Sequence, residues 1–230
     1  MENLVKKLQK EAKQFLTGAK LLFRNVEIIP KEIEVYFYKE GVFPDNSVHQ
    51  KKYQTKEYKN HFYVHRCKKS DSYKGGNRAG LDFVVSDETD TYYSYLIRSA
   101  VINGKTIYGP NNVLNTIKEL CGNISYEEIE KQVVELKASN VEYDYVVFTT
   151  RYKLGKDVDE YFRSRKLRLV LLDNLFKESK YKAKEDIVLD FFKQTNYQKK
   201  QAFDYCKSHM SYVPSKVKDY YEQNDHDSSR

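Results

Sequence analysis

The sequence has few of the residues that break, cross-link or anchor a chain. Its 230 residues include 9 glycines, 4 prolines and no tryptophan, so long disordered linkers are not expected. The three cysteines are odd in number and widely spaced, which argues against a disulfide framework and favours reduced thiols. No segment approaches the ~18 apolar residues of a membrane span, and the amphipathic N-terminus has no signal core. We therefore expect a cytoplasmic protein without a membrane partner.

Positive charge is concentrated in one part of the chain. The formal net charge is +7, and residues 51–78 alone hold nine basic and two acidic residues. Tyrosines are frequent, with 21 in the chain, and a tyrosine ring can stack while its hydroxyl stays polar. A clustered positive charge beside aromatic rings is typical of proteins that bind a polyanion. A solvated, highly charged surface explains the charge alone equally well.

Apolar spacing and turn signals predict an α+β chain. A helix is expected over 3–20, where apolar residues recur at helical spacing. Runs of β-branched and aromatic residues predict strands at 32–38, 61–66, 81–87, 92–102, 143–150 and 167–172. Further helices should run from 111 or 112 to Gly122, from a capping box of Ser125 and Glu128 to about 137, and over much of the chain after 174. Strands that cluster early, with helices flanking and following them, favour a mainly antiparallel sheet.

The strand at 32–38 has polar and apolar residues in alternation. Residues two apart share a face, so Glu34 and Tyr36 point one way while Val35 points the other. A carboxylate beside an aromatic face suits an enzyme that excises a nucleobase, because the ring can stack on the flipped base. The carboxylate can take a proton from water as the glycosidic bond breaks. A half-exposed strand with a wet face is the more common explanation of such alternation.

Several common catalytic motifs are missing from the sequence. It has no phosphate-binding glycine loop, no nucleophile elbow and no paired CxxC. His61, His65 and Cys67 are close enough to suggest a metal site, but a fourth ligand is not evident. We expect no metal and no organic cofactor.

Six segments, in order, resemble the alkyladenine (3-methyladenine, methylpurine) DNA glycosylases. "EIEVY" resembles the family's Glu-x-Glu-Ala-Tyr strand, "DNSVH" its acidic-x-x-x-His stretch and "FYVHR" its Tyr-Val-Tyr strand. "SYLIRSAVINGKTIYGPNNVL" resembles the run that leads into a Gly-Pro helix start, and "TTRYKL" with "KLRLVL" resembles the two closing strands. The resemblance covers about 12–172. It implies a curved, partly open, barrel-like sheet flanked by helices in a domain over 1–172, followed by a helical extension over 173–230 packed on it.

The resemblance also implies roles for individual residues. Glu34 would be the base that activates water, and Arg98 would orient it. Tyr36 would stack on one face of the extruded base, with His49 and His65 on the other. The family's pocket asparagine falls near Asp82 or Phe83, and the sequence does not distinguish between them.

The loop after His65 departs from the family pattern. It is longer here, and its basic residues would grip phosphates around the flipped nucleotide: Arg66, Lys68, Lys69, Lys74 and Arg78. Tyr73 would fill the gap left by the base, although a solvated turn is the commoner place for such a residue.

The function implied is that of a monofunctional DNA glycosylase of base excision repair. It would act as a monomer on duplex DNA and hydrolyse alkylated or otherwise modified bases to leave an abasic site. The alternative is a non-catalytic nucleic-acid-binding relative.

Overall fold

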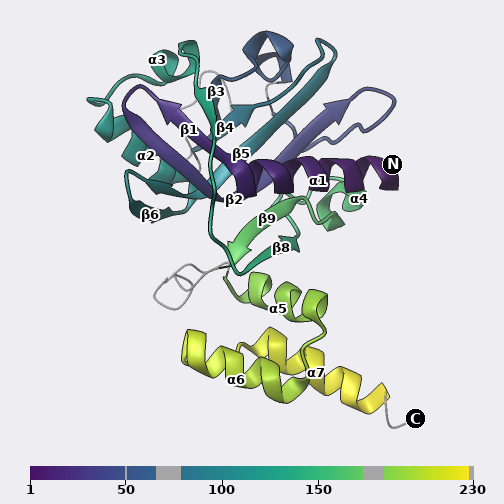
Figure 1. Cartoon of the computed structure of the whole chain (residues 1–230). Helices are drawn as coiled ribbons and strands as arrows, with labels where there is room; N and C mark the ends of the chain where they lie inside the picture. Colours follow the sequence, from purple (N-terminus) through teal and green to yellow (C-terminus); the bar gives the residue numbers. More distant parts are fainter. Residues whose placement is uncertain (50, 66–78, 173–183, 228–230) are drawn as a thin grey trace. The chain divides into compact units, whose positions relative to one another are not determined.

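The structure of the chain is a computed structural model that describes residues 1–49, 51–65, 79–172 and 184–227. These residues form two compact units (Figure 1). The first unit comprises Met1–Glu142 and Thr150–Leu169, and the second comprises Tyr143–Thr149 and Val170–Arg230. Among the described helices, none is both long and apolar enough to cross a membrane.

The first unit opens with helix α1 (Glu2–Gly18), which buries one apolar stripe. The stripe consists of Val5, Leu8, Ala12, Phe15 and Leu16. The predicted helix ran to 20, but the chain becomes extended at Ala19, where strand β1 (Ala19–Phe23) begins. Alternate residues of β1 are buried. Pairing of these residues with the neighbouring strands therefore stabilises the extended conformation more than a longer helix would.

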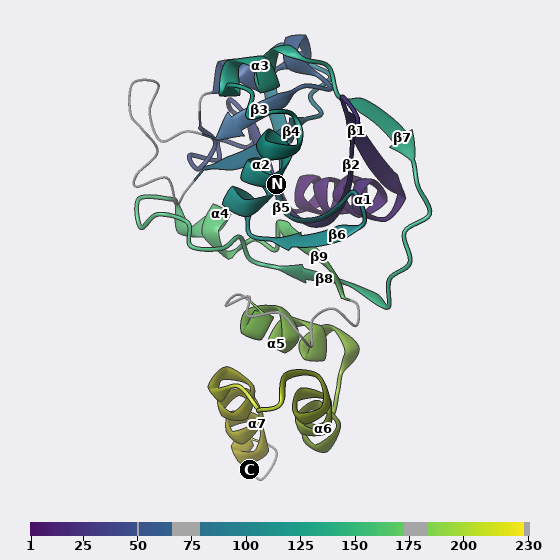
Figure 2. The ribbon, with the colours of Figure 1, turned by 90° about the vertical axis from the view of Figure 1, so that its left-hand side faces the viewer.

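Six strands form the main antiparallel sheet of this unit, in the order β3-β4-β5-β2-β1-β7. The sheet curls into a half-barrel (Figure 2). A further strand, β6 (Lys105–Tyr108), extends the pairing of β5. The other new strands are β2 (Val26–Lys39), β3 (Phe62–His65), β4 (Gly80–Val84), β5 (Thr91–Ile102) and β7 (Glu135–Ala138).

Strand register divides the sheet into two faces. Val35, Tyr95 and Phe83 lie opposite one another on neighbouring strands and point into the core. There the ring of Phe15 from α1 lies 4.7 Å from Tyr95 and 5.6 Å from Phe83, measured between centroids. The adjacent row, Glu34, Leu96, Asp82 and Tyr63, points to the opposite face because side chains alternate along a strand. The register thus gathers polar residues from three strands, β2, β4 and β3, on one face.

Short helices connect the strands. Helix α2 (Pro110–Leu120) contacts β4 and β5, and the predicted end near Gly122 agrees with it. Helix α3 (Tyr126–Lys131) has the predicted capping box. It ends six residues before the expected limit near 137, because the chain enters β7, which pairs with β1. The remaining helices are η1 (Lys51–Tyr53), η2 (Lys56–Tyr58) and α4 (Glu160–Ser164).

The second unit contains a short strand and three helices. Strand β8 (Tyr145–Thr149) pairs with β9 (Arg168–Leu172), whose first two residues belong to the first unit. Helices α5 (Lys184–Thr195), α6 (Lys199–Met210) and α7 (Ser215–Asp227) enclose a core in which the rings of Phe191 and Phe192 meet Tyr197 and Tyr205. The predicted α+β class, with a curled antiparallel sheet and C-terminal helices, is confirmed.

Candidate functional site

The polar face of β2 is buried. Glu34 is 1% exposed and Tyr36 7%, while Ile33 and Val35 on the opposite face are also inaccessible. The alternation in this strand therefore does not mark a boundary between core and water. It separates the apolar core on one face of the strand from a buried polar cluster on the other. The interpretation of this segment as a half-exposed strand is therefore wrong.

Three groups donate hydrogen bonds or charge to the Glu34 carboxylate. The hydroxyl of Tyr36 lies 3.0 Å from Oε2, and the backbone N–H of Tyr152 lies 2.7 Å from Oε1. Arg98 places Nη1 3.2 Å from the same Oε1. These contacts hold the Glu34 carboxylate in one orientation, and the Arg98 guanidinium places a positive charge beside it. The expected proximity of Glu34 to Tyr36 and Arg98 is present in the structure.

A second carboxylate, Glu32, lies on the same strand. Its Oε1 accepts from Nε of Arg98 at 3.0 Å and from Nε of Arg168 at 2.7 Å, and its Oε2 accepts from the hydroxyl of Ser99 at 2.8 Å. Burial alone would raise the pKa of Glu32, but the two guanidinium groups and the Ser99 bond outweigh it and lower the pKa. A shift of register on both sides of Glu32 lets Ser99 and Arg98, adjacent in sequence, both reach this carboxylate.

The ring of Tyr36 has a positive charge beneath it. The guanidinium carbon of Arg151 is 5.1 Å from the ring centroid, and its Nη1 is 2.7 Å from the carboxylate of Asp45. Both members of this ion pair have fully buried side chains. Burial, together with the negative charge of Glu34, raises the pKa of Tyr36 well above its ordinary value. Tyr36 is therefore a neutral hydrogen-bond donor at physiological pH.

Two histidines complete the aromatic part of the cluster. The ring centroid of His65 is 6.3 Å from Tyr36 and 5.0 Å from His49, and the two imidazoles are almost perpendicular. The His65 side chain is one-fifth exposed, and its Nδ1 lies 3.6 Å from Oδ2 of Asp82. That separation is too long for a hydrogen bond but close enough for charge attraction. His49 is exposed, and its carbonyl oxygen accepts from the Gln54 amide.

The two imidazoles have opposite pKa shifts. Burial tends to lower the pKa of His65, but the carboxylate of Asp82 more than offsets this, so the pKa of His65 is raised. The pKa of His49 is lowered, first because neighbouring groups remove part of its exposed ring from water and then by the positive charge of His65. At neutral pH the inner imidazole thus holds a proton more readily than the outer one.

Some expected site residues are not brought into this cluster. Phe83 points into the core, where its ring centroid is 5.6 Å from Phe15 and 6.1 Å from Phe62. Of the two alternatives for the family's pocket asparagine, only Asp82 therefore lies beside the histidines. The predicted phosphate-gripping residues and the predicted wedge lie outside the described residues: Arg66, Lys68, Lys69, Tyr73, Lys74 and Arg78.

The possible metal ligands do not form a cluster in the described part of the chain. His61 places Nδ1 3.0 Å from the carbonyl oxygen of Lys59, and Cys67 lies outside the described residues. Within residues 1–49, 51–65, 79–172 and 184–227, no group of three or more His, Cys, Asp or Glu side chains is placed to hold a metal ion.

A lysine from the basic part of the sequence reaches the strand that carries the site. Lys51 places Nζ 3.1 Å from the ring centroid of Tyr38, two residues beyond Tyr36 on the same strand. The ring of Tyr38 packs against the small apolar group formed by Tyr36, Val48 and Leu96. Positive charge is therefore present at the edge of the site.

Sequence reasoning missed four residues of the polar cluster. They are Glu32, Arg151, Tyr152 and Arg168. Arg168 stands in an otherwise apolar strand, which is the same signal that drew attention to Arg98. Tyr152 acts through its backbone N–H, and a side-chain motif cannot reveal such a contact.

Neither a family model nor a curated protein matches this sequence. The geometry of the site and the segments that resemble the alkyladenine DNA glycosylases are therefore the two grounds for a functional proposal. Chemically, the cluster offers a carboxylate, a guanidinium that orients it, and three aromatic rings, of which His65 lies 6.3 Å from Tyr36 and 5.0 Å from His49 between centroids.

Proposed function

We propose that this protein is a monofunctional DNA glycosylase that hydrolyses alkylated or otherwise modified bases from duplex DNA. The observation that carries the proposal is the meeting of Glu34, Arg98 and Tyr36 within 3.2 Å, next to the imidazoles of His65 and His49. Base excision needs a carboxylate, a group that orients this carboxylate, and aromatic rings that stack on the extruded base.

The flipped base would lie between Tyr36 and His65. Two stacked contacts of ~3.5 Å each require a gap of about 7 Å, and the present centroid separation is 6.3 Å with the rings tilted by 43°. A movement of about 1 Å, with the rings becoming parallel, would admit a base. His49 is exposed and packs edge-on against His65, so it is the group that can move aside and then cover the base.

Water is the nucleophile in this proposal. Its oxygen bonds to C1′ of the sugar while Glu34 takes its proton, and the glycosidic electron pair leaves with the base. An alkylated purine carries a positive charge, so it departs neutral and needs no proton from the protein. Arg98 orients Glu34 through its contact with Oε1, and Oε2, which accepts from the Tyr36 hydroxyl, has a second lone pair that would take the proton of the water.

A non-catalytic nucleic-acid-binding relative is the second candidate. The burial of Glu34 favours this candidate. Its side chain is 1% exposed, and both carboxylate oxygens already accept hydrogen bonds from protein groups. In that case Glu34 would be structural, the domain would bind DNA with strong salt dependence, and no base would be released.

An excision screen separates these possibilities. Duplex and single-stranded oligonucleotides carrying different modified bases are incubated with the wild type, with Glu34→Gln and with Glu27→Gln. Glu27 is a matched control because it is a carboxylate on the same strand that pairs with a lysine at 2.8 Å, but its side chain is 42% exposed. Release of a base by the wild type and by Glu27→Gln, but not by Glu34→Gln, supports the glycosylase. DNA binding without release of any base by the wild type supports the second candidate.

A further inference from the structure

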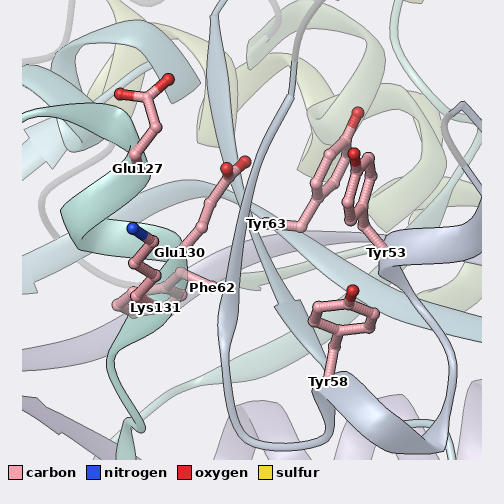
Figure 3. A pocket seen from close by; sticks show the side chains of 7 residues that line it. All are labelled: Tyr53, Tyr58, Phe62, Tyr63, Glu127, Glu130 and Lys131. Carbon is pink, nitrogen blue, oxygen red and sulfur yellow. The ribbon is translucent and has the colours of Figure 1, made fainter.

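A pocket separate from the Glu34 cluster lies between helix α3 and the segment 53–63. Its volume is about 200 Å³ (Figure 3). Three tyrosines line one side, Tyr53, Tyr58 and Tyr63, and Phe62 lines its floor together with α3. Drug-sized ligands occupy pockets of roughly 300–1,000 Å³, so this one suits a single small group.

The tyrosine rings are arranged as the walls of a cage. Tyr53 and Tyr58 are almost perpendicular, at 73°, with centroids 5.7 Å apart. Tyr63 stacks on Tyr53, at 12° and 6.2 Å, and is only 3% exposed, so it mainly supports the Tyr53 ring. Ring faces carry negative electrostatic potential and attract ammonium groups, and choline or methyl-lysine cages are built from such rings.

The charge of the pocket favours a cation. Helix α3 contributes two carboxylates, Glu127 and Glu130, and one ammonium group, Lys131. The lining therefore carries one excess negative charge within a chain of net charge +7. In Figure 3 the Glu130 carboxylate projects from α3 toward the ring of Tyr63. A phosphate-bearing ligand would meet these acids unfavourably, whereas an ammonium group would be attracted by both the rings and the acids.

One ring of the cage already interacts with an ammonium group of the protein. Lys52 places Nζ 4.8 Å from the centroid of Tyr53. This contact indicates that the electrostatic attraction expected of the rings operates at this surface. Glu130 is in turn fixed by the backbone N–H of Val64, which donates to its Oε1 at 3.0 Å. The acid is thus held against strand β3 beside the rings.

We infer that this pocket binds a methylated ammonium group, carried either by a small molecule or by a methylated lysine side chain of a partner. The trimethylammonium group fits because its methyl groups contact ring carbons while its charge is spread over them. It also loses less hydration on burial than a primary ammonium group does. Neither Glu34 nor Tyr36 lines this pocket, but it adjoins the proposed base-binding cluster, because the ring of Tyr63 also lies 6.3 Å from that of His65.

Titration of the full chain with choline, followed by calorimetry and by the aromatic proton signals of the tyrosines, tests the inference. The control ligand is 3,3-dimethylbutanol, which has the shape of choline but carbon in place of nitrogen and no charge. Choline should bind at least several-fold more tightly than this neutral analogue. Equal affinity for the two ligands, or no binding of choline, would overturn the inference without requiring any variant.

Variants then locate the site and identify the source of the cation. Tyr58→Leu should weaken choline binding roughly 2- to 30-fold, the usual range for the loss of one ring–cation contact, while Tyr143→Leu, an exposed tyrosine outside the pocket, should leave it unchanged. Glu130→Gln should weaken choline more than dimethylbutanol. A peptide containing trimethyllysine that binds more tightly than both choline and its unmethylated form indicates a partner protein, and the reverse order indicates a small molecule. Tighter binding of a nucleoside monophosphate than of any ammonium probe would refute the inference.

Discussion

Two carboxylates on strand β2 should respond in opposite ways to the same substitution. Glu32 and Glu34 are two residues apart, each is 1% exposed, and both contact Arg98. In the proposed mechanism only Glu34 meets the reacting water, whereas Glu32 ties Arg98 to Arg168. Glu34→Gln should therefore remove activity with a moderate loss of stability, and Glu32→Gln should remove stability with a moderate loss of activity.

The contacts set the size of each effect. Glu32→Gln breaks the buried contacts with both arginines, which costs about 3–5 kcal/mol and lowers Tm by roughly 6–20 °C for a chain of this size. Glu34→Gln leaves Arg98 paired with Glu32, and the amide can still accept from the Tyr152 N–H and donate to the Tyr36 hydroxyl. Its cost is therefore about 1–3 kcal/mol. Loss of a general base should lower the excision rate by about 10²–10⁴-fold.

Single-turnover excision measured at 15 °C, together with calorimetric melting, separates the two variants. At that temperature a chain with a stability of ~5–15 kcal/mol keeps at least about half of each variant folded, and the rates can be corrected for the folded fraction. Glu32→Gln should then excise within about tenfold of the wild type. The reasoning is wrong if Glu34→Gln excises at the wild-type rate, or if the two variants lose activity in proportion to their stability.

Two further predictions concern the groups around the aromatic rings. Asp45→Asn leaves the buried guanidinium of Arg151 without its charged partner at 2.7 Å, so it should cost about 3–5 kcal/mol in urea unfolding, and a cost below 1 kcal/mol would contradict this. The NMR titration of the histidines should place the pKa of His65 above the ordinary value and that of His49 below it, and Asp82→Asn should move the pKa of His65 below the ordinary value because burial then outweighs the remaining charge of Glu34. Since the folded pKa of His65 is raised, the stability contributed by its pairing with Asp82 is present below pH ~6.5 and is lost as the pH rises through the raised pKa; an unchanged His65 titration in Asp82→Asn would refute the assignment.

Local signals predicted the elements but not the depth at which they lie. The capping box of Ser125 and the apolar alternation of Ile33 and Val35 depend on neighbouring residues, and both are present in the structure. Burial of Glu34 depends on Tyr152, 118 residues away, and that of Glu32 depends on Arg168, 136 residues away. A half-exposed strand and a strand with an interior polar cluster have the same alternation, so the sequence could not distinguish them.

The missed strands have a similar physical cause. Strand β7 is exposed at all four positions, and the sequence of β1, AKLLF, has three apolar residues in a row although its burial alternates. Neither short sequence therefore shows a strong period-2 pattern. Their extended conformation results from pairing with each other and, for β1, with β2. Strand propensity depends strongly on such neighbours, which short segments do not record in their own composition.

The packing of Leu96 between Gly80 and Tyr36 offers a test of how neighbouring residues support the site. Gly80 lies opposite His65, and a Cβ built there would be 2.7 Å from Cδ1 of Leu96 and 3.4 Å from Cβ of Pro110. Leu96 lies opposite Glu34 and packs against Tyr36. Because Pro110 is rigid and Leu96 can rotate, the methyl group of Gly80→Ala should push Leu96 toward Tyr36 and Glu34.

Such overpacking costs about 1–3 kcal/mol, so Tm should fall by roughly 2–12 °C. Gly18→Ala is the matched control, since a Cβ at that position meets nothing within 4 Å. Excision by Gly80→Ala should fall further than its folded fraction, because the ring of Tyr36 and the carboxylate it contacts would both be displaced. If Gly80→Ala melts and excises like the control, Leu96 does not set the position of Tyr36, and the base-binding surface must be held by Arg151 and Asp45 from the other side of the ring.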